Sequence, residues 1–223
     1  MLRGNTVSLR KSFVVVDDHP LYRHGVVALV EQELHLTLAG EAGTIPEAME
    51  LIRRQKPDLA IIDISLQEKN GLELVKMVKT ECPSIAIVVL SMHEEILYGD
   101  RAINAGALGY VMKHEAPAIL LQRIQAVLEG KVAVSDALRE RMLATLVGGR
   151  HDKDPIERLS DRELEVFRLI GRGYGAAEIA DMLHLSVKTV NAYRDHIKEK
   201  LNIGSASELR KMAVEWTTTA DKI

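Results

Sequence analysis

The chain has 223 residues, of which 47% are hydrophobic and 27% are charged, and it carries a formal net charge of -3. These proportions are those of a globular protein with a real core, and no run approaches the roughly 18 apolar residues of a membrane span. The single cysteine, Cys82, excludes a disulfide framework and fits a reducing cytoplasm, and the weakly acidic balance requires any nucleic-acid binding to come from a local surface.

Short apolar runs alternate with segments of helical periodicity up to residue 130. Apolar residues at spacings of three and four are typical of helices, and continuous apolar runs are typical of buried parallel strands. The expected strands cover residues 12–17, 36–42, 58–63, 85–90 and 107–112. The expected helices cover residues 21–32, 45–54, 71–80, 94–105 and 117–129. This alternation predicts the α/β fold class, here a five-stranded, doubly wound parallel sheet with helices on both faces.

Three carboxylates stand where two of these strands end. Asp17 and Asp18 follow the first strand, and Asp63 ends the third. Parallel strands that lie side by side bring their carboxyl ends to one edge, where open α/β sheets bind ligands. Acids crowded at that edge repel one another, which favours a divalent cation. Ligands that are all oxygen suit Mg²⁺, which is normally shared with a phosphate.

A hydroxyl and an ammonium group are expected at the same edge. The apolar run at 85–90 ends on Ser91, and the run at 107–112 ends on Lys113. A carboxylate nucleophile, a magnesium site, a hydroxyl donor and a fixed cation are the groups needed to accept and hold a phosphoryl group. The sequence therefore predicts a phosphoryl-accepting site at this edge of the sheet.

Each of these residues also has a structural interpretation. The acids could end a strand and cap the next helix, and Ser91 could cap the helix after it. Lys113 could be a solvated loop lysine. His19 and His93 are interpreted as ordinary loop histidines and not as metal ligands, because a magnesium site takes oxygen.

The chain changes character after residue 130. A short helix is expected at Asp136 to Leu146, and the segment VGGRHDKDPIE then breaks all periodicity, as a flexible linker does. From Ser160 the pattern is purely helical, and helices at Ala176 to Leu183 and Val187 to Leu201 are joined by a short turn. Such a pair predicts a helix-turn-helix, whose second helix enters a major groove.

The first part of the chain resembles the receiver domain of bacterial two-component response regulators. The order and spacing that carry the resemblance are those of Asp17, Asp18, Asp63, Ser91 with Met92 after it, Tyr110 and Lys113. The resemblance implies a flavodoxin-like receiver over residues 11–130, with strand order 2-1-3-4-5. It also implies that Asp63 is the site of phosphorylation.

The same resemblance implies a cofactor and a switch. Mg²⁺ would be held by Asp18, Asp63 and the carbonyl of Ser65, with Asp17 acting through water. The added phosphoryl charge would be drawn to a lysine and a serine, and a tyrosine would move inward behind the serine. These implied switch residues are Ser91, Tyr110 and Lys113.

Residues 158–217, which follow a helix and linker at 131–157, resemble the LuxR-type DNA-binding domain. The resemblance is carried by LSDREL and by GAAEIADMLHLSVKTVNAYRDHIKEKL. It implies a recognition helix within Ser186 to Leu201. The implied internal residues are Glu163, Ile179, Ala180, Leu183, Val190, Ile197 and Leu201. The implied groove-facing residues are Lys188, Thr189, Asn191, Ala192, Arg194, Asp195 and Lys198.

Two positions depart from the family pattern. Asp195 stands where relatives often carry a cation, and two interpretations stay open: it accepts from a cytosine amine, or it forms an ion pair with a neighbour such as Lys198. Gly175 stands where relatives commonly place a serine or threonine at a helix start, and glycine is an acceptable substitute. Of the other groove-facing residues, the basic ones can neutralise phosphates, and Asn191 can pair with an adenine edge.

The two resemblances imply a phosphorylation-controlled transcription factor of the NarL/FixJ type and not an enzyme. A sensor histidine kinase would phosphorylate Asp63, and the product would bind double-stranded DNA in the cytoplasm as a homodimer. A magnesium-dependent phosphatase or phosphotransferase is one alternative, although no insertion is long enough for a substrate-enclosing cap. A DNA-binding regulator gated by another ligand is the second, and the intact set of acid, hydroxyl and lysine argues against it.

Overall fold

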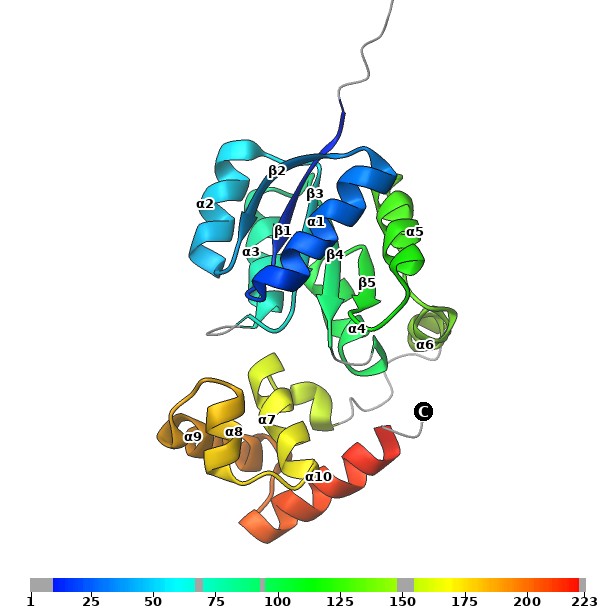
Figure 1. The fold of residues 1–223 in the computed structure, drawn as a ribbon. Coiled ribbons are helices and arrows are strands. Elements are labelled where there is room, and N and C mark those ends of the chain that lie inside the picture. Colours follow the sequence, from blue (N-terminus) through cyan, green and yellow to red (C-terminus); the bar gives the residue numbers. More distant parts are fainter. Residues whose placement is uncertain (1–9, 67–69, 93–94, 148–154, 221–223) are drawn as a thin grey trace, which may run out of the picture. The chain divides into compact units, whose positions relative to one another are not determined.

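The computed structural model describes residues 10–66, 70–92, 95–147 and 155–220, which form two compact units (Figure 1). The first unit reaches Arg139 and the second begins at Glu140. Residues 148–154, the centre of the expected linker, lie outside the described residues. Among the helices of the described residues, none has the length and apolar character needed to span a membrane.

The first unit is built on a five-stranded parallel sheet in the order β2-β1-β3-β4-β5. Its strands are β1 Ser12–Val16, β2 Thr37–Ala42, β3 Leu59–Asp63, β4 Ala86–Ser91 and β5 Gly109–Met112. These are the five strands that the apolar runs predict, and their ends lie within two residues of the prediction. The fold class and the strand order that the resemblance implies are both confirmed.

Helices cover both faces of this sheet (Figure 1). They are α1 Pro20–Leu34, α2 Ile45–Gln55, α3 Gly71–Glu81, α4 Glu95–Ala105 and α5 Pro117–Leu128. Helix α1 contacts α5 on one face, and α2 contacts α3, which contacts α4, on the other. Because the central strands are covered on both faces, every residue of β3 is buried, including Asp63. This explains why the strands read as continuous apolar runs.

After α5 the chain returns to the free edge of the sheet. Ala133 pairs with Gly109 of β5, and its N–H donates to the carbonyl of Leu108 at 2.7 Å. The N–H of Ser135 then donates to the carboxylate of Glu95 in α4 at 3.0 Å. Helix α6, Asp136–Val147, follows directly. The segment after α5 is therefore tied to both β5 and α4.

The second unit is helical. It contains the short 3-10 helix η1 Pro155–Arg158 and the helices α7 Asp161–Gly171, α8 Ala176–Met182, α9 Val187–Leu201 and α10 Ala206–Ala220. Helix α7 packs on α9 and α10, and α8 packs on α9. The expected internal residues are all buried, namely Glu163, Ile179, Ala180, Leu183, Val190, Ile197 and Leu201. This confirms the helix-turn-helix arrangement of α8 and α9.

Polar contacts fix the starts of these helices. Ser160 and Glu163 form a capping box, in which the Glu163 carboxylate accepts from the Ser160 N–H at 2.7 Å. Glu163 also accepts from Lys200 Nζ at 2.6 Å, which ties α7 to α9. At the start of α8, the Gly175 N–H donates to Glu178 at 2.7 Å, so a glycine there leaves the helix start intact.

Candidate functional site

Backbone hydrogen bonds continue past the strand ends and align one edge of the sheet. The N–H of Ile64 donates to the carbonyl of Leu90 at 3.0 Å, and the N–H of Lys113 donates to the carbonyl of Ser91 at 2.7 Å. The residues that end β1, β3 and β4, and the lysine after β5, therefore share the carboxyl edge. This is the edge where the sequence places its candidate site.

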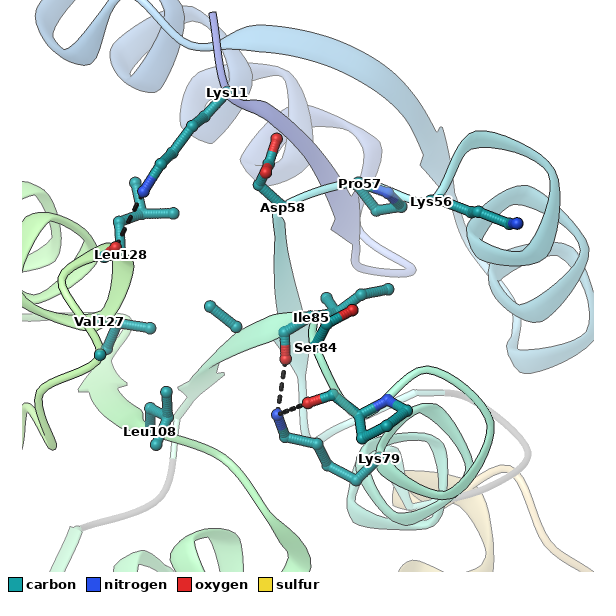
Figure 2. Close-up of a pocket in the computed structure, with 13 residues that line it drawn as sticks. Lys11, Lys56, Pro57, Asp58, Lys79, Ser84, Ile85, Leu108, Val127 and Leu128 are labelled. Atoms are coloured by element: carbon teal, nitrogen blue, oxygen red, sulfur yellow. Dashed lines mark hydrogen bonds between the residues drawn. The ribbon is translucent and has the colours of Figure 1, made fainter. Parts of the chain in front are cut away.

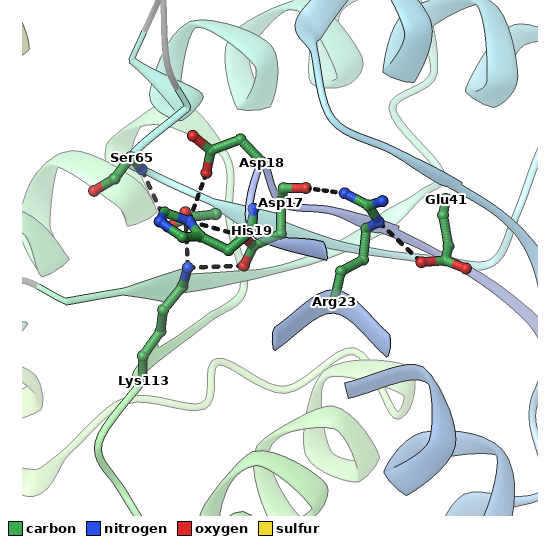
Figure 3. Close-up of polar contacts among 8 residues, drawn as sticks. Asp17, Asp18, His19, Arg23, Glu41, Ser65 and Lys113 are labelled. Atoms are coloured by element: carbon green, nitrogen blue, oxygen red, sulfur yellow. Dashed lines mark hydrogen bonds and ion pairs between the residues drawn. The ribbon is translucent and has the colours of Figure 1, made fainter. Parts of the chain in front are cut away.

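Lys113 lies between two buried carboxylates (Figure 3). Its Nζ is 2.8 Å from Asp63 Oδ2 and 2.7 Å from Asp17 Oδ2, and only 6% of its side chain is exposed. The Ser65 N–H donates to Asp63 Oδ1 at 3.1 Å, and the His19 N–H donates to Asp17 Oδ1 at 2.8 Å. Each of the two carboxylates is thus oriented by a backbone donor and by the same ammonium group.

Asp18 completes an acidic cluster beside this pair. Side-chain ligand atoms of Asp17, Asp18, His19 and Asp63 all lie within 4.8 Å of one another. His19 Nδ1 is 2.8 Å from Asp18 Oδ1, a contact that its interpretation as an ordinary loop histidine did not anticipate. His93 lies outside the described residues.

The acidic cluster has the charge and the donors to hold a divalent cation. Among the described residues, the three carboxylates of the cluster have one ammonium beside them, that of Lys113, which pairs with Asp17 and Asp63, so the ionised cluster is short of positive charge. Asp17 Oδ2 and Asp18 Oδ1 are buried, and they lie 2.7 Å from Lys113 Nζ and 2.8 Å from His19 Nδ1 respectively. Carboxylate oxygens are the ligands that Mg²⁺ prefers, and the residues present therefore fit that ion.

Burial controls the protonation of the site. Burial raises the pKa of Asp63 to about 6; the charge of Asp17 adds to this effect, and Lys113 opposes it. Burial by itself would lower the pKa of Lys113, but the charges of Asp63 and Asp17 outweigh it and raise that pKa above its usual value. The site therefore holds a carboxylate that is costly to ionise next to a firmly protonated amine.

A close backbone approach holds the loop after Asp63. A Cβ atom at Gly71 would lie 2.0 Å from the carbonyl oxygen of Asp63, so only glycine fits there. The Gly71 N–H donates to the carbonyl of Ile64 at 2.7 Å, and the side chain of Asn70 caps α3 by accepting from Leu72 N–H at 2.9 Å. The chain thus folds back directly behind the candidate acceptor.

Two residues of α1 belong to the site but were not predicted from the sequence. The Tyr22 ring lies with its centroid 4.6 Å from Lys113 Nζ, a cation–π contact. Arg23 donates to the carbonyl of Asp17 at 2.5 Å and to Glu41 at 2.9 Å. Because Pro20 starts α1 immediately after the acidic pair, the first turn of this helix has to lie at the same edge. The position of Pro20 just after the acidic pair was the sequence signal that could have placed the first turn of α1, and with it Tyr22 and Arg23, near the site.

The two remaining switch candidates are also buried. Ser91 ends β4, and the ring of Tyr110 in β5 is fully buried in this structure. The carbonyl of Tyr110 accepts from Arg123, which also pairs with Glu95 at 2.9 Å. The face formed by α4, β5 and α5 is thus connected by polar contacts as well as by packing.

A hollow at the opposite edge of the sheet contains lysines in a structural role (Figure 2). Lys79 Nζ donates to the carbonyls of Pro83 at 3.0 Å and Ile85 at 2.7 Å, and Lys11 Nζ donates to the carbonyl of Leu128 at 2.9 Å. These ammonium groups satisfy carbonyls in the loop between α3 and β4 and at the end of α5. Asp58 is the one carboxylate among the residues that line this hollow, so the lining offers no cluster of acids like that of the carboxyl edge.

The recognition helix α9 presents the predicted groove residues unequally. The exposed ones are Lys188, Asn191, Ala192 and Asp195, and the partly buried ones are Thr189, Arg194 and Lys198. Asp195 forms an ion pair with Lys198 at 2.9 Å, one of the two interpretations that the sequence left open. Its side chain is nevertheless 68% exposed and therefore accessible to DNA as well.

The sequence matches two protein families, one in each unit. Residues 13–125 match the response regulator receiver domain, and residues 157–213 match the bacterial regulatory proteins of the luxR family. The response regulator UvrY of Escherichia coli K12 is 30% identical over 90% of this chain and 92% of its own length. The chain belongs to the response regulators with a LuxR-type DNA-binding domain. Members of this family are DNA-binding transcription regulators, which sets the phosphatase alternative aside.

Two further proteins support this assignment. The response regulator GacA of Pseudomonas aeruginosa is 34% identical over 90% of this chain and 94% of its own length. A structure of RcsB from Salmonella enterica serovar Typhimurium, bound to promoter P1flhDC in the presence of the phosphomimetic BeF3-, is similar with a TM-score of 0.59. That match has 25% sequence identity and covers 92% of this chain and 98% of RcsB.

Proposed function

We propose that a sensor histidine kinase transfers a phosphoryl group to Asp63 and that this modification controls DNA binding by the second unit. The observation that carries the proposal is the position of Lys113, whose ammonium lies within 2.8 Å of both Asp63 and Asp17 at the carboxyl edge. A carboxylate oxygen of Asp63 would attack phosphorus, forming an O–P bond as the donor's N–P bond breaks. The fixed cation then stabilises the charge of the product.

The acidic cluster would hold Mg²⁺ during this reaction. Asp18, Asp63 and the Ser65 carbonyl are its proposed ligands, and Asp17 acts through water. When bound, Mg²⁺ supplies charge neutralisation at the oxygens of the transferring group. The chain itself contributes the orientation of both carboxylates, through the N–H groups of Ser65 and His19.

The added charge would change the contacts of the switch residues. Lys113 now bridges two carboxylates, and a phosphoryl group on Asp63 brings a stronger acceptor to the same ammonium. Ser91, which ends the neighbouring strand, donates its hydroxyl to the new oxygens. Tyr110 is already buried, so its role is to hold the inward position that phosphorylation favours.

We infer that the phosphorylated protein binds the major groove of DNA as a homodimer in the cytoplasm, where the chromosome and the kinase domain meet. The proposed DNA contacts come from α9 and are Lys188, Thr189, Asn191, Ala192, Arg194, Asp195 and Lys198. The exposure of Asn191 and Lys188 on that helix supports this assignment. Their chemistry suits an adenine edge and a phosphate respectively.

The proposed domain limits are 11–130 for the receiver, 131–157 for the helix and linker, and 158–217 for the DNA-binding domain. A fragment of residues 150–223 should fold by itself, because the apolar residues of α7 to α10 bury one another and Ile156 and Leu159 close the same core. Circular dichroism and thermal melting test this. A fragment without helical signal in native buffer would contradict the boundary.

The proposed function is tested by selecting DNA from a random-sequence duplex library with the full chain. Acetyl phosphate with Mg²⁺ should increase the enrichment of one sequence, and Asp63→Asn should remove the increase. Asp58→Asn is the matched control, because this carboxylate accepts from the Ser12 N–H at the opposite edge of the sheet. Enrichment that is identical with and without acetyl phosphate would exclude control by phosphorylation, whereas no enrichment at all would exclude DNA binding.

A further inference from the structure

A hollow in the second unit lies beside the recognition helix. It has a volume of about 370 Å³ and is bordered by the turn between α7 and α8, by α9 and by the start of α10. Arg194 and Arg210 both line it, together with the hydroxyl-bearing residues Tyr174 and Ser207. No carboxylate is among the residues that line the hollow. Two positive charges therefore share one concave surface that contains no counter-charge.

Neither arginine forms an ion pair with a carboxylate among the residues that the structure describes. The charge of Arg194 acts on Asp195 and helps to lower the pKa of that carboxyl, but Asp195 forms its ion pair with Lys198, at 2.9 Å. Arg210 donates only to the carbonyl of Gly173, over 3.4 Å. The nearby carboxylates are engaged elsewhere, Glu178 with the Gly175 N–H at 2.7 Å and Glu208 with the Gly204 N–H at 3.1 Å. Two guanidinium groups that are not held in ion pairs keep planar donor sets that can bind phosphate oxygens.

The position of Arg194 on α9 decides what kind of anion reaches it. Val190 and Ile197 are fully buried, and Arg194 follows the first by four residues and precedes the second by three. Its Cα therefore lies on the inner side of the helix, and its side chain passes along the flank to the hollow. Asn191 and Asp195 occupy the exposed side. When that side enters a major groove, the flank of the helix meets the sugar–phosphate backbone and not the base edges.

We propose that this hollow is a seat for one phosphodiester group of duplex DNA, bound jointly by Arg194 and Arg210. The inference rests on the proposed DNA binding and deepens it by assigning one backbone contact to two helices. Arg210 lies outside the helix-turn-helix, so α10 takes part in DNA binding as well as in the core. Tyr174 and Ser207 border the seat and offer hydroxyl donors to the remaining phosphate oxygens.

The salt dependence of DNA affinity tests the proposal. The probe is the duplex that the full chain enriches from a random-sequence library, measured beside a single-mismatch duplex. Arg210→Ala should weaken binding to both duplexes equally, roughly tenfold, and should reduce the steepness of the plot of log affinity against log salt by about 0.9. Arg194→Ala should do the same. Because the two arginines hold one phosphate, the double variant should lose no more slope than either single variant.

Two control variants distinguish a specific phosphate contact from a general effect of positive charge on DNA binding. Lys211→Ala removes the neighbouring cation of α10, which lies 3.9 Å from Glu215 and outside the hollow, and it should leave the slope unchanged. Arg210→Lys should keep the slope and lose part of the affinity, since a point charge replaces a planar donor set. The melting temperature of each variant shows whether an effect on binding is a loss of folding.

Neutral linkages in the DNA locate the phosphate. A methylphosphonate is placed at each backbone position in turn. It should weaken DNA binding by the wild-type chain at one position per half-site, and at that position it should cause no further loss of affinity in Arg210→Ala. Loss at that position in both chains, or an unchanged slope in Arg210→Ala, overturns the seat. If the wild-type chain enriches no duplex at all, the proposed function fails and the seat fails with it. If the wild-type chain enriches a duplex and Arg210→Ala matches it in affinity and slope, only the seat is wrong.

Discussion

Replacing Asp63 by asparagine should make the first unit more stable by about 3 kcal/mol at neutral pH in the absence of divalent cations. The reason is the cost of ionising a buried acid that has two other acids beside it. Burial raises the pKa of Asp63 to about 6, while in the unfolded chain a carboxyl of this type titrates near 4. An amide of the same shape carries no charge and so avoids this cost.

The pH dependence of this gain has a definite sign. Between about pH 4 and pH 6 the folded protein holds a proton on Asp63 that the unfolded chain has already released. The wild-type protein therefore loses stability as the pH rises through this window, and the loss is complete above it. The advantage of Asp63→Asn should accordingly be full near neutrality and should vanish as the pH falls towards 4.

Native-state hydrogen exchange of the β3 amides measures this effect in the full chain, because it reports on the first unit alone. Asp136→Asn is the matched control, since 88% of that side chain is exposed, and it should change stability little. Mg²⁺ should stabilise the wild-type protein more than Asp63→Asn. Acetyl phosphate should also fail to phosphorylate the variant. An Asp63→Asn variant less stable than the wild type at neutral pH would refute the ionisation cost.

The carboxyl edge of the sheet is predictable because the relevant signals are local. Apolar runs that end on acids, a serine and a lysine specify both the strands and the edge at which those side chains emerge. The strand order is different in kind, since periodicity records which segments are strands and not which strands are neighbours. Only the resemblance to receivers places β1 next to β3, and therefore Asp17 next to Asp63.

Contacts between elements that are distant in the chain could not be predicted in detail from the sequence. The position of Tyr22 over Lys113 depends on the rotation of α1 against the sheet, which no local pattern specifies. The extension of the sheet by Ala133 depends on where the chain goes after α5. Arg194 is different, because it was expected among the groove-facing residues, whereas its spacing from the buried Val190 and Ile197 puts its Cα on the inner side of α9.

Replacing Lys113 by methionine should have the opposite effect from Asp63→Asn and should destabilise the first unit by about 3 kcal/mol or more at neutral pH. Methionine preserves most of the aliphatic volume against Tyr22 but removes the ammonium that, among the described residues, pairs with both Asp17 and Asp63. Two buried carboxylates are then left without a cation. The loss should shrink at low pH, where the acids become neutral, and Mg²⁺ should reverse part of it.

Lys79→Met is the matched control for this substitution. Lys79 is also partly buried, but its ammonium binds two carbonyl oxygens and, among the residues that the structure describes, no carboxylate, and burial lowers its pKa. Its removal should therefore cost only the hydrogen bonds, about 1 kcal/mol. A similar loss in both variants would mean that the effect of Lys113 comes from packing and not from charge.

The double variant Asp63→Asn with Lys113→Met isolates the interaction between the two groups. If Lys113 acts by compensating the acids, its removal should cost less once Asp63 is neutral, because one acid fewer is left unpaired. The same lysine should also read the phosphoryl group. Acetyl phosphate should still phosphorylate Asp63 in Lys113→Met, yet the DNA affinity of this variant should not rise on phosphorylation. A normal rise would leave Lys113 as a stabiliser of the unmodified site, and the response to the new charge would then have to come from Ser91.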